Sequence, residues 1–279
     1  MSSYELPATA TKPVTHAVIP VRRSLSTRWI SLLTLVALLV IWWAVTATGL
    51  IEPLFLPPPS AVLQKGWLLA TTGYMDSTLW QHLGASLSRI GLGLGFAVLT
   101  AVPVGIAIGS NRIARGVLDP LIEFYRPIPP LAYLPLVVIW VGIGEASKTL
   151  VIGIAMLAPI AISTAAGVRA TARERVNAAR ALGATPGQVV RHVVLPSALP
   201  SILTGVRIAL GAGWSTVVAA ELIGARAGLG FMIQSASQYL VTDIVVMGII
   251  VIAVVAFILE SGIRWLERRL VPWAGQVSS

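Results

Sequence analysis

The stretch from Ile30 to Ile51, ISLLTLVALLVIWWAVTATGLI, decides the fold class because its 22 residues include no charged side chain. A helix rises about 1.5 Å per residue, so ~20 residues cross the roughly 30 Å hydrocarbon core of a bilayer. Two further uncharged runs of 22 and 20 residues cover Ile90–Asn111 and Thr149–Val168. A soluble apolar core does not require uncharged runs of this length. The three runs therefore predict transmembrane helices.

Three later segments complete the predicted membrane domain, but each is interrupted. Leu199–Leu222 contains Arg207, and Ile244–Ile263 carries a glutamate near its end. Leu131–Ile143 is short and follows the prolines at positions 127, 129 and 130. Prolines at membrane depth leave backbone groups that neighbouring protein must satisfy, so we expect this segment to face other helices and not lipid. The sequence thus predicts an all-α integral membrane protein with about six spans.

The net charge of +9 is compatible with nucleic-acid binding, but the distribution of the charges argues against such a partner. With six spans and a cytoplasmic N-terminus, only Lys65, Arg89, Lys148 and Arg226 fall outside or toward the outer half. The remaining sixteen of the 20 Lys and Arg residues, Arg126 among them, lie on or near the inner side. This bias follows the positive-inside rule of membrane proteins. It predicts a multi-pass membrane protein with both termini in the cytoplasm and an even number of spans.

The predicted spans divide the chain into regions. These are a cytoplasmic N-terminal tail (1–28), a first transmembrane helix (29–51), an outer connecting segment (52–83), a transmembrane core (84–266) with an inner loop (169–200), and a cytoplasmic C-terminal tail (267–279). The first apolar run exceeds the about 7–15 residues of a cleaved signal peptide, so we expect it to be retained. Within the outer segment, Ser60–Leu69 is expected to form a short interfacial helix.

Glycines four residues apart mark the second span. The pairs Gly91–Gly95 and Gly105–Gly109 leave room for close approach of a neighbouring helix. The run from Gly91 to Gly95 is not a nucleotide-binding loop, because it lies inside a membrane run with no strand before it. We therefore expect both pairs to pack against other helices.

The inner loop between the fourth and fifth spans predicts two short helices around a turn. The first, about Ala172–Leu182, ends at Gly183, a suitable C-cap. Thr185 is expected to be the N-cap of the second helix, with Pro186 in its first turn. Because proline disfavours helix at the residue before it, we expect this helix to end before Leu195–Pro196. Such a protrusion fits a groove on a partner protein, although a basic loop touching anionic lipid headgroups remains open as an alternative.

From Arg175 this loop reads RVNAARALGATPGQVVRHVVLP. It resembles the coupling motif of ATP-binding-cassette (ABC) importer permeases, which has Glu-Ala-Ala, then Gly, then Ile-x-Leu-Pro. The matching positions are Asn177, Ala178, Ala179, Gly183, Val193, Leu195 and Pro196. Asn in place of Glu and Val in place of Ile are the departures, and the first removes a possible salt bridge or helix-terminus contact. In that family the loop inserts into a cleft on the ATPase subunit and transmits its closure.

Other segments are similar to the nitrate, sulfonate and taurine branch of these permeases. They are Leu54–Pro59, Arg126–Pro135, Gly213–Ser215 and the pair Ala220-Glu221, while Met75–Leu83 and Gly228–Ala236 point more narrowly to taurine permeases. The resemblance implies a type I ABC importer permease fold, with the later five spans as the shared core. It also implies a second copy of the chain, two ABC ATPase subunits that bind the ATP, and a periplasmic solute-binding protein. The implied solute is taurine first, with other aliphatic sulfonates or nitrate as alternatives.

The residues argue against catalysis by this chain. A phosphate-binding loop needs glycine before its lysine, whereas Lys12, Lys65 and Lys148 follow Thr, Gln and Ser. The histidines at positions 16, 82 and 192 fall in the tail, the outer segment and the inner loop, so we expect surface residues and no metal site. We therefore expect no catalytic residue, no metal and no cofactor on this chain. An ATP-independent transporter or channel stays open, and its mark would be transport in vesicles without ATP.

Four residues of the fifth span are candidates for the translocation pathway: Arg207, Trp214, Ser215 and Glu221. Arg207 and Glu221 are 14 residues apart, which is ~21 Å along a helix, so they cannot pair with each other. Each charge must face a cavity, a partner helix or an interface. For each, a structural ion pair is the alternative to a role toward an anionic solute.

Overall fold

The computed structural model describes residues 27–272, so most of the predicted N-terminal tail (1–28) and residues 273–279 of the predicted C-terminal tail lie outside this range. Residues 267–270, predicted to belong to that tail, are helical. The described part is helical, apart from an isolated bridge between Tyr74 and Ser77. Its elements are α1 (Thr27–Ala47), α2 (Pro59–Thr71), α3 (Leu79–Ser110), α4 (Arg112–Tyr125), α5 (Pro130–Val141), α6 (Glu145–Arg169), α7 (Arg173–Ala181), α8 (Pro186–Val189), the π-helix η1 (Val190–Val194), α9 (Leu195–Glu221), α10 (Leu229–Gln238) and α11 (Thr242–Leu270). The all-α prediction is confirmed.

Five stretches are long and apolar enough to cross a membrane: α1, α3, α6, α8–α9 taken together, and α11. The pair α4–α5 passes the same test as one element bent by 105°, which gives up to six crossings, as predicted. The helix α5 alone has only 12 residues, too few to span a bilayer. The break between α4 and α5 coincides with Pro127, Pro129 and Pro130, which cannot continue a helix.

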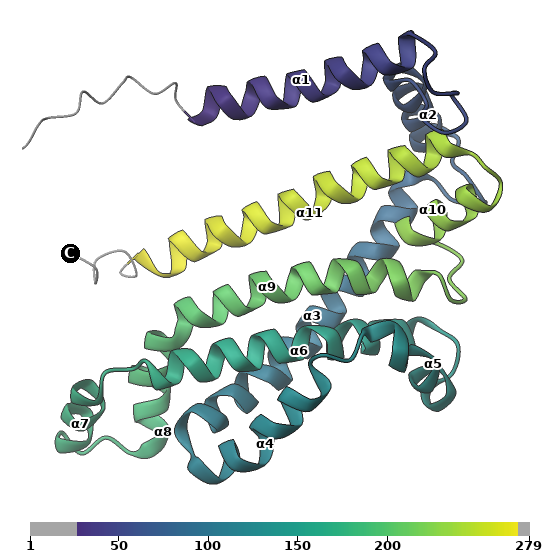
Figure 1. Cartoon of the computed structure of the whole chain (residues 1–279). Helices are drawn as coiled ribbons and strands as arrows, with labels where there is room; N and C mark the ends of the chain where they lie inside the picture. Colours follow the sequence, from purple (N-terminus) through teal and green to yellow (C-terminus); the bar gives the residue numbers. More distant parts are fainter. Residues whose placement is uncertain (1–26, 273–279) are drawn as a thin grey trace, which may run out of the picture.

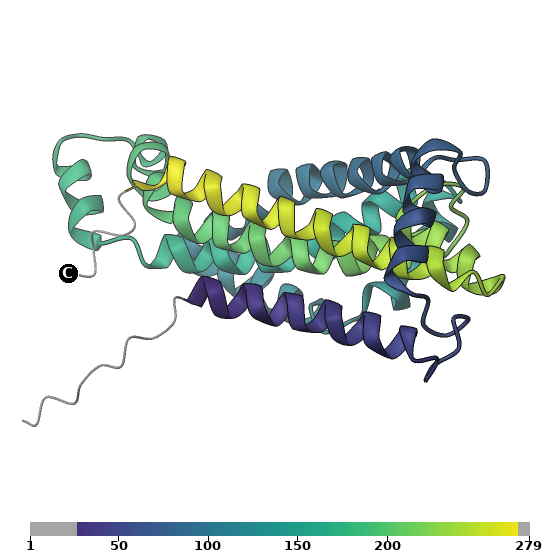
Figure 2. The same ribbon diagram turned by 90° about the horizontal axis from the view of Figure 1, so that it is seen from above.

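The crossings run between two ends of the molecule (Figure 1). We call the end that carries α7 and α8 the α7 end, and the opposite end, with α2, α5 and α10, the α10 end. The helix α1 begins and α11 finishes at the α7 end, so the described chain starts and stops on the same side (Figures 1 and 2). This arrangement agrees with the predicted even number of crossings.

The core lies among α3, α6 and α9, and a stripe of small residues on α3 sets its spacing. Gly93, Ala97, Ala101 and Gly105 recur every four residues and are buried. A Cβ added at Gly105 would lie 2.5 Å from Thr164 Cβ, so α3 and α6 are in direct backbone contact there. The predicted packing role is confirmed for Gly105 and Gly109. Within one chain it does not hold for Gly91 and Gly95, which have nothing within 4 Å, because the buried stripe passes through Gly93 and not through these two residues.

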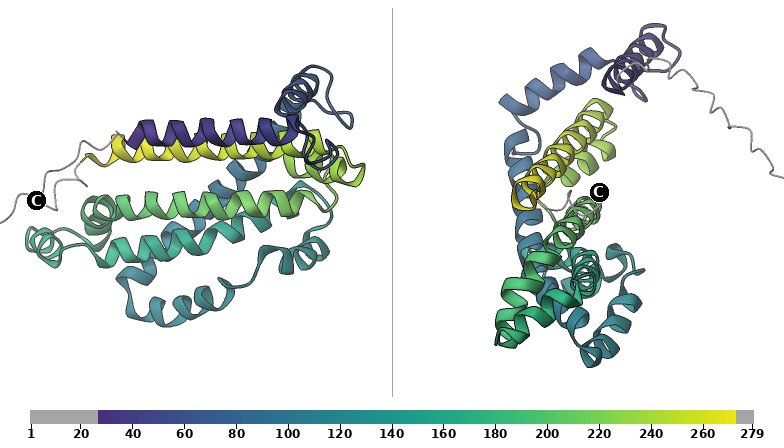
Figure 3. Two further views of the ribbon diagram at one scale, coloured as in Figure 1. Left: turned by 45° about the horizontal axis from the view of Figure 1, so that its top comes forward. Right: turned by 90° about the vertical axis from the view of Figure 1, so that its left-hand side faces the viewer.

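The N-terminal helices attach mainly at the α10 end. The indole of Trp42 in α1 donates a hydrogen bond to Pro57 O at 3.1 Å, and otherwise α1 lies apart from the core (Figure 3). The helix α2 packs on α11, where a Cβ at Gly66 would meet the Met247 side chain. The predicted helix at 60–69 is confirmed, and Trp67 on it is exposed.

The segment after the proline cluster is exposed in the single chain. Ile139 and Trp140 of α5 are 76% and 72% exposed, while Leu134 and Val137 pack against α6. The prediction that this segment faces other helices with little exposure is therefore wrong within one chain. Only one side of α5 finds a neighbour because the 105° bend carries it away from the core.

Candidate functional site

The α7–α8 segment (residues 173–194) protrudes beyond the core, and its turn has the predicted geometry. Gly183 has φ +84°, and Ala184 N donates to Ala179 O at 3.0 Å, which closes the C-terminus of α7. Thr185 Oγ1 accepts from Gln188 N, while Gln188 Oε1 accepts from Thr185 N at 2.8 Å. This reciprocal capping box starts α8. The predicted C-cap and N-cap roles are confirmed.

The second helix of the segment does not end before Pro196, and that prediction is wrong. It continues through the π-helix η1 into α9, giving a bent helix from Pro186 to Glu221. The Leu195 N–H donates to Val190 O, five residues back, so the turn before the proline is wider than an α turn. A wider turn accommodates Pro196, whose ring would clash with the carbonyl four residues earlier in an α-helix. The α7–α8 segment is therefore continuous with a membrane-spanning helix.

One side of the α7–α8 segment is anchored and the other is unpartnered. Val189 and Val194 are buried with Val168 of α6 and Ala198 of α9. On the other side α7 has no buried residue, and Leu182 is 89% exposed. A hollow of about 390 Å³ opens there, lined by Ala179, Leu182, Gly183, Ala184, Gln188, His192 and Val193. Asn177 and Ala178 are also exposed.

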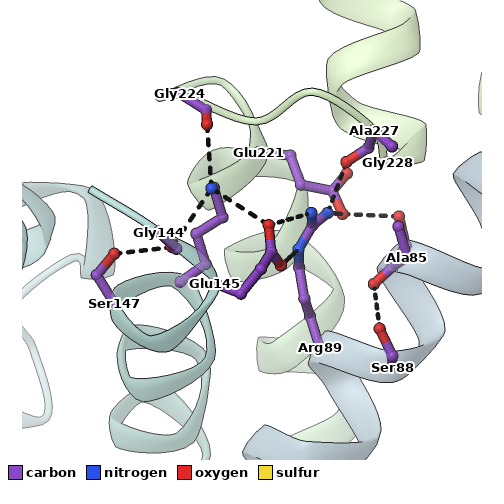
Figure 4. A network of polar contacts seen from close by, with 12 residues as sticks. Ala85, Ser88, Arg89, Gly144, Glu145, Ser147, Glu221, Gly224, Ala227 and Gly228 are labelled. Carbon is purple, nitrogen blue, oxygen red and sulfur yellow. Dashed lines mark hydrogen bonds and ion pairs between the residues drawn. The ribbon is translucent and has the colours of Figure 1, made fainter. Parts of the chain in front are cut away.

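A buried polar network joins α3, α6, α9 and α10 near the α10 end (Figure 4). Arg89 of α3 donates to both oxygens of Glu145, from Nε at 2.6 Å and from Nη2 at 2.8 Å. Its Nη1 donates to Glu221 Oε1 at 2.7 Å and to Ala227 O at 2.8 Å. The Arg89 and Glu221 side chains are 4% and 0% exposed. Lys148 extends the network by donating to Gly224 O at 3.2 Å.

The same network caps the N-terminus of α10. The backbone N–H groups of Gly228, Leu229 and Gly230 donate to His82 Nδ1, Ser86 Oγ and Glu221 Oε2, respectively. A helix leaves its first N–H groups without intrahelical partners, and here side chains from α3 and α9 satisfy three of them. The negative charge of Glu221 is also favourable at a helix N-terminus. A Cβ at Gly228 would lie 2.3 Å from Glu221 Cδ, so the carboxylate requires glycine there.

His82 is fully buried, so the prediction that it is a surface residue is wrong. It belongs to the first turn of α3, which begins at Leu79 and not at the predicted boundary of 84. Its Nδ1 accepts from Gly228 N, so its Nε2 carries the proton and donates to Tyr74 O at 3.1 Å. The signal for this position was the Gly228-Leu229-Gly230 turn, whose free N–H groups require acceptors from elsewhere.

The four predicted pathway residues fall in different surroundings. Glu221 belongs to the network, whereas Arg207 lies 4.0 Å from Glu267 of α11. Trp214 is 7% exposed, and its indole N–H is buried without a hydrogen-bond partner among residues 27–272. Ser215 alone lines a large cavity, which lies between the α4–α5 break, α6 and α9 and measures about 440 Å³. The structure therefore does not bring the four together.

Arg126 also lines this cavity, although the sequence placed it near the inner side. The hydroxyl of the preceding residue, Tyr125, donates to Ile154 O at 3.5 Å. Ile154 is the tenth of the 25 residues of α6, close to the middle of that span. The prediction of an inner position is thus wrong, because the chain breaks at 126–129 half-way through the crossing and not at its start.

The described residues thus form an all-helical domain with five or six candidate membrane crossings and a protruding two-helix segment. Residues 101–272 match the family described as binding-protein-dependent transport system inner membrane component, and the chain belongs to this family. It is 57% identical over 263 residues to the taurine transport system permease protein TauC of Escherichia coli (strain K12), covering 91% of this chain and 96% of TauC.

Two further similarities identify the branch of the family and the fold of the chain. The chain is 35% identical over 238 residues to the putative aliphatic sulfonates transport permease protein SsuC of the same Escherichia coli strain, covering 85% of this chain and 89% of SsuC. A structure of the MetNI methionine ABC transporter in inward-facing conformations superposes with a TM-score of 0.61 at 21% identity, covering 69% of this chain and 95% of that one. The expected type I ABC importer permease fold is confirmed.

Proposed function

We propose that this chain is the membrane-spanning subunit of an ATP-driven importer that carries taurine across the bacterial inner membrane. The observation that carries the proposal is the 57% identity to TauC over nearly the full length of both chains. Similarity of this extent covers the α7–α8 segment, the polar network and the cavity together. Both termini are proposed to be cytoplasmic, so that the α7 end faces the cytoplasm.

The exposed side of the α7–α8 segment supports a partner ATPase. The segment presents Asn177, Ala178 and Gly183 on its surface, while its inner side is anchored on α6 and α9. Such a rigid, exposed protrusion suits insertion into a groove. In this proposal ATP is bound by two ATPase subunits, a second copy of this chain completes the pathway, and a periplasmic protein delivers the solute.

The continuity of α8, η1 and α9 supplies a mechanical link. When ATP binding closes the ATPase subunits, the two α7–α8 segments are drawn together. Because α8 and α9 form one bent helix, this movement passes into the middle of the membrane, where Ala212 and Ser215 line the cavity. The pathway then opens outward to receive solute, and hydrolysis restores the inward-facing state.

Deletion of the gene tests the proposal. A strain without this chain is expected to lose growth on taurine as the sole sulfur source and to keep growth on sulfate. Uptake of labelled taurine should return when the chain is restored together with its ATPase and binding protein. Unchanged taurine uptake in a deletion strain that has no second taurine system would overturn the proposal.

Another aliphatic sulfonate is the second candidate solute, favoured by the similarity to SsuC. Competition separates the two: excess unlabelled aliphatic sulfonate should reduce taurine uptake less than excess taurine does. The ATP-independent alternative predicts uptake into vesicles that hold no ATP. Purified chain alone is expected to hydrolyse no ATP, and measurable hydrolysis by it would count against a separate ATPase.

A further inference from the structure

Arg126 occupies an unusual place, at the break of the bent element α4–α5. Its cavity is lined from α6 by Ala155, Ala158 and Pro159, which surround the centre of that 25-residue helix. From α9 it is lined by Ile208 and Ala212, close to the centre of that 27-residue helix. The guanidinium group therefore lies near the middle of the membrane and not at either surface.

The charge of Arg126 is uncompensated within the described chain. Among residues 27–272 its side chain makes no hydrogen bond and no ion pair, and the residue is exposed. An arginine that faces hydrocarbon is strongly unfavourable, so charged residues at this depth face a water-filled cavity or a ligand. Arg89, also inside a membrane-spanning helix, satisfies this requirement with two carboxylates and a carbonyl. Arg126 has no such partner among residues 27–272 and lines only the cavity.

The cavity around Arg126 has a mainly apolar lining that carries a few hydrogen-bond donors. Ser163 and Tyr133 are among the lining residues, and their hydroxyls make no hydrogen bond to another residue of the described range 27–272. No carboxylate is among the lining residues, and Glu123, one turn earlier on α4, is not one of them. A volume of about 440 Å³ falls within the roughly 300–1,000 Å³ of small-molecule sites.

This donor set suits an oxyanion. The planar guanidinium presents two parallel N–H groups that match two oxygens of a sulfonate or phosphate, and hydroxyls donate to a third. The cavity remains open beside the exposed Ile208 and Ser215. An open site binds weakly, which transport requires because the solute must leave again.

We propose that Arg126, with the hydroxyls of Ser163 and Tyr133, forms a transient binding site for the sulfonate group of the solute half-way across the membrane. The proposal rests on the proposed function, since a sulfonate must be the cargo. It adds a recognition step within the permease to the selection made by the solute-binding protein. Arg126 is thereby a specificity-determining residue.

Transport by the complete reconstituted complex tests the site. Replacing Arg126→Gln is expected to lower taurine uptake at least tenfold, and Arg126→Lys to lower it less because the charge remains without the planar fork. ATP hydrolysis stimulated by the binding protein should stay within twofold of normal, which shows that the complex is assembled. The matched control is Arg112→Gln, which removes an exposed arginine from the same helix outside the cavity and should leave uptake unchanged.

Because the chain contains no cysteine, a chemical test needs no background substitutions in it. Ser215→Cys, which lines the cavity and leaves Arg126 in place, is expected to react with a small anionic methanethiosulfonate that carries a sulfonatoethyl group, and millimolar taurine should slow the reaction severalfold. Labelling is measured on this chain within the complex. Phe124→Cys, 76% exposed but outside the cavity, should react slowly and without effect of taurine.

The outcomes separate this inference from the proposed function. Wild-type complex that imports taurine, with Arg126→Gln importing it at the normal rate, overturns the site alone. So does a Ser215→Cys variant that is unreactive or indifferent to taurine. Wild-type complex that imports a different anion and no taurine overturns the proposed solute. If Arg126→Gln then impairs uptake of that anion, the proposed oxyanion site is supported, with that anion as its solute.

Discussion

The polar network at the α10 end and the α7–α8 segment at the other end solve opposite problems. In the network every charged group is paired, and the Arg89 and Glu221 side chains are only 4% and 0% exposed, while Glu145 at the edge of the network is 64% exposed. In the α7–α8 segment α7 has no buried residue, and its turn is held by backbone geometry, a capping box and the packing of Ala184 on the cluster around Val189. The first region binds four helices together, whereas the second presents a surface to a partner.

This difference indicates which region contributes mainly to the stability of the fold and which contributes mainly to function. Substitutions in the network leave buried charges without partners, so they act on folding first. Substitutions on the exposed side of the α7–α8 segment change little buried surface, so we expect them to act on coupling to the proposed ATPase. The bent helix from Pro186 to Glu221 joins the two regions, because Glu221 is its last residue.

The largest effect is expected for Arg89→Ala. It leaves the buried Glu221 without its charged partner, whereas Glu145 keeps Lys148 at 3.5 Å. Breaking a buried ion pair by removing one member destabilises by about 3–5 kcal/mol. We expect little folded protein in the membrane, measured by the yield and the thermal midpoint in detergent. Arg226→Ala, which removes a nearby exposed arginine, is the control and should behave as wild type. A thermal midpoint for Arg89→Ala within 2 °C of normal would contradict a structural role for the network.

A smaller effect is expected where α3 and α6 touch, between the two regions. Gly105→Leu places a side chain against Thr164 and the Ala161 carbonyl, and overpacking a tight contact typically costs about 1–3 kcal/mol. Gly91→Leu, on the same helix with nothing within 4 Å, should be tolerated. Thermal midpoints of the two variants measure the difference. Equal midpoints would mean that the α3–α6 contact is looser than its geometry indicates.

Gly183→Val is expected to change function more than stability. With φ +84° at Gly183, a residue bearing a Cβ is strained by about 1 kcal/mol, which is small against the whole fold. The altered turn redirects α7 relative to α8, so uptake and solute-stimulated ATP hydrolysis should fall together. Normal uptake by Gly183→Val would exclude this segment as the coupling element.

The control for that variant is Gly187→Ala. Gly187 is four residues away, has open space around it and no positive φ, so the helix accepts alanine there. A glycine in a membrane-spanning helix, such as Gly248 in α11, would be an unsuitable control, because a Cβ added there would lie 2.5 Å from Ile233 Cγ1. Uptake by Gly187→Ala should match wild type.

The sequence predicted those features that depend on local chemistry. The spans follow from uncharged runs, and the turn at Gly183–Thr185 follows from capping preferences of the residues themselves. The continuation of α8 into α9 was missed because a proline signals a helix end, whereas here a π turn absorbs it.

Features that depend on distant residues could not be predicted in this way. Arg89 directly precedes an uncharged run, so it was taken as the edge of a span and not as its interior. Its partners Glu145 and Glu221 are 56 and 132 residues away, and no spacing rule connects them. The depth of Arg126 was missed for a related reason, since it depends on where a bent helix pair breaks relative to α6.

The smallest effect is expected for Thr185→Val, which removes the capping hydroxyl and keeps the shape of the side chain. The Gln188 N–H then loses its protein partner, and loss of an N-cap costs about 0.5–2 kcal/mol. Water replaces the hydroxyl at this exposed site, so we expect the lower half of that range. The backbone amides of residues 187–190 should then exchange with deuterium about twofold to fivefold faster, whereas those of α10 should be unchanged because the network is untouched. Thr71→Val is the matched control, since its hydroxyl only bonds carbonyls of its own helix and caps no free N–H. Faster exchange that spreads to α10 would show that the two ends are not independent, and the separation drawn between them would then be wrong.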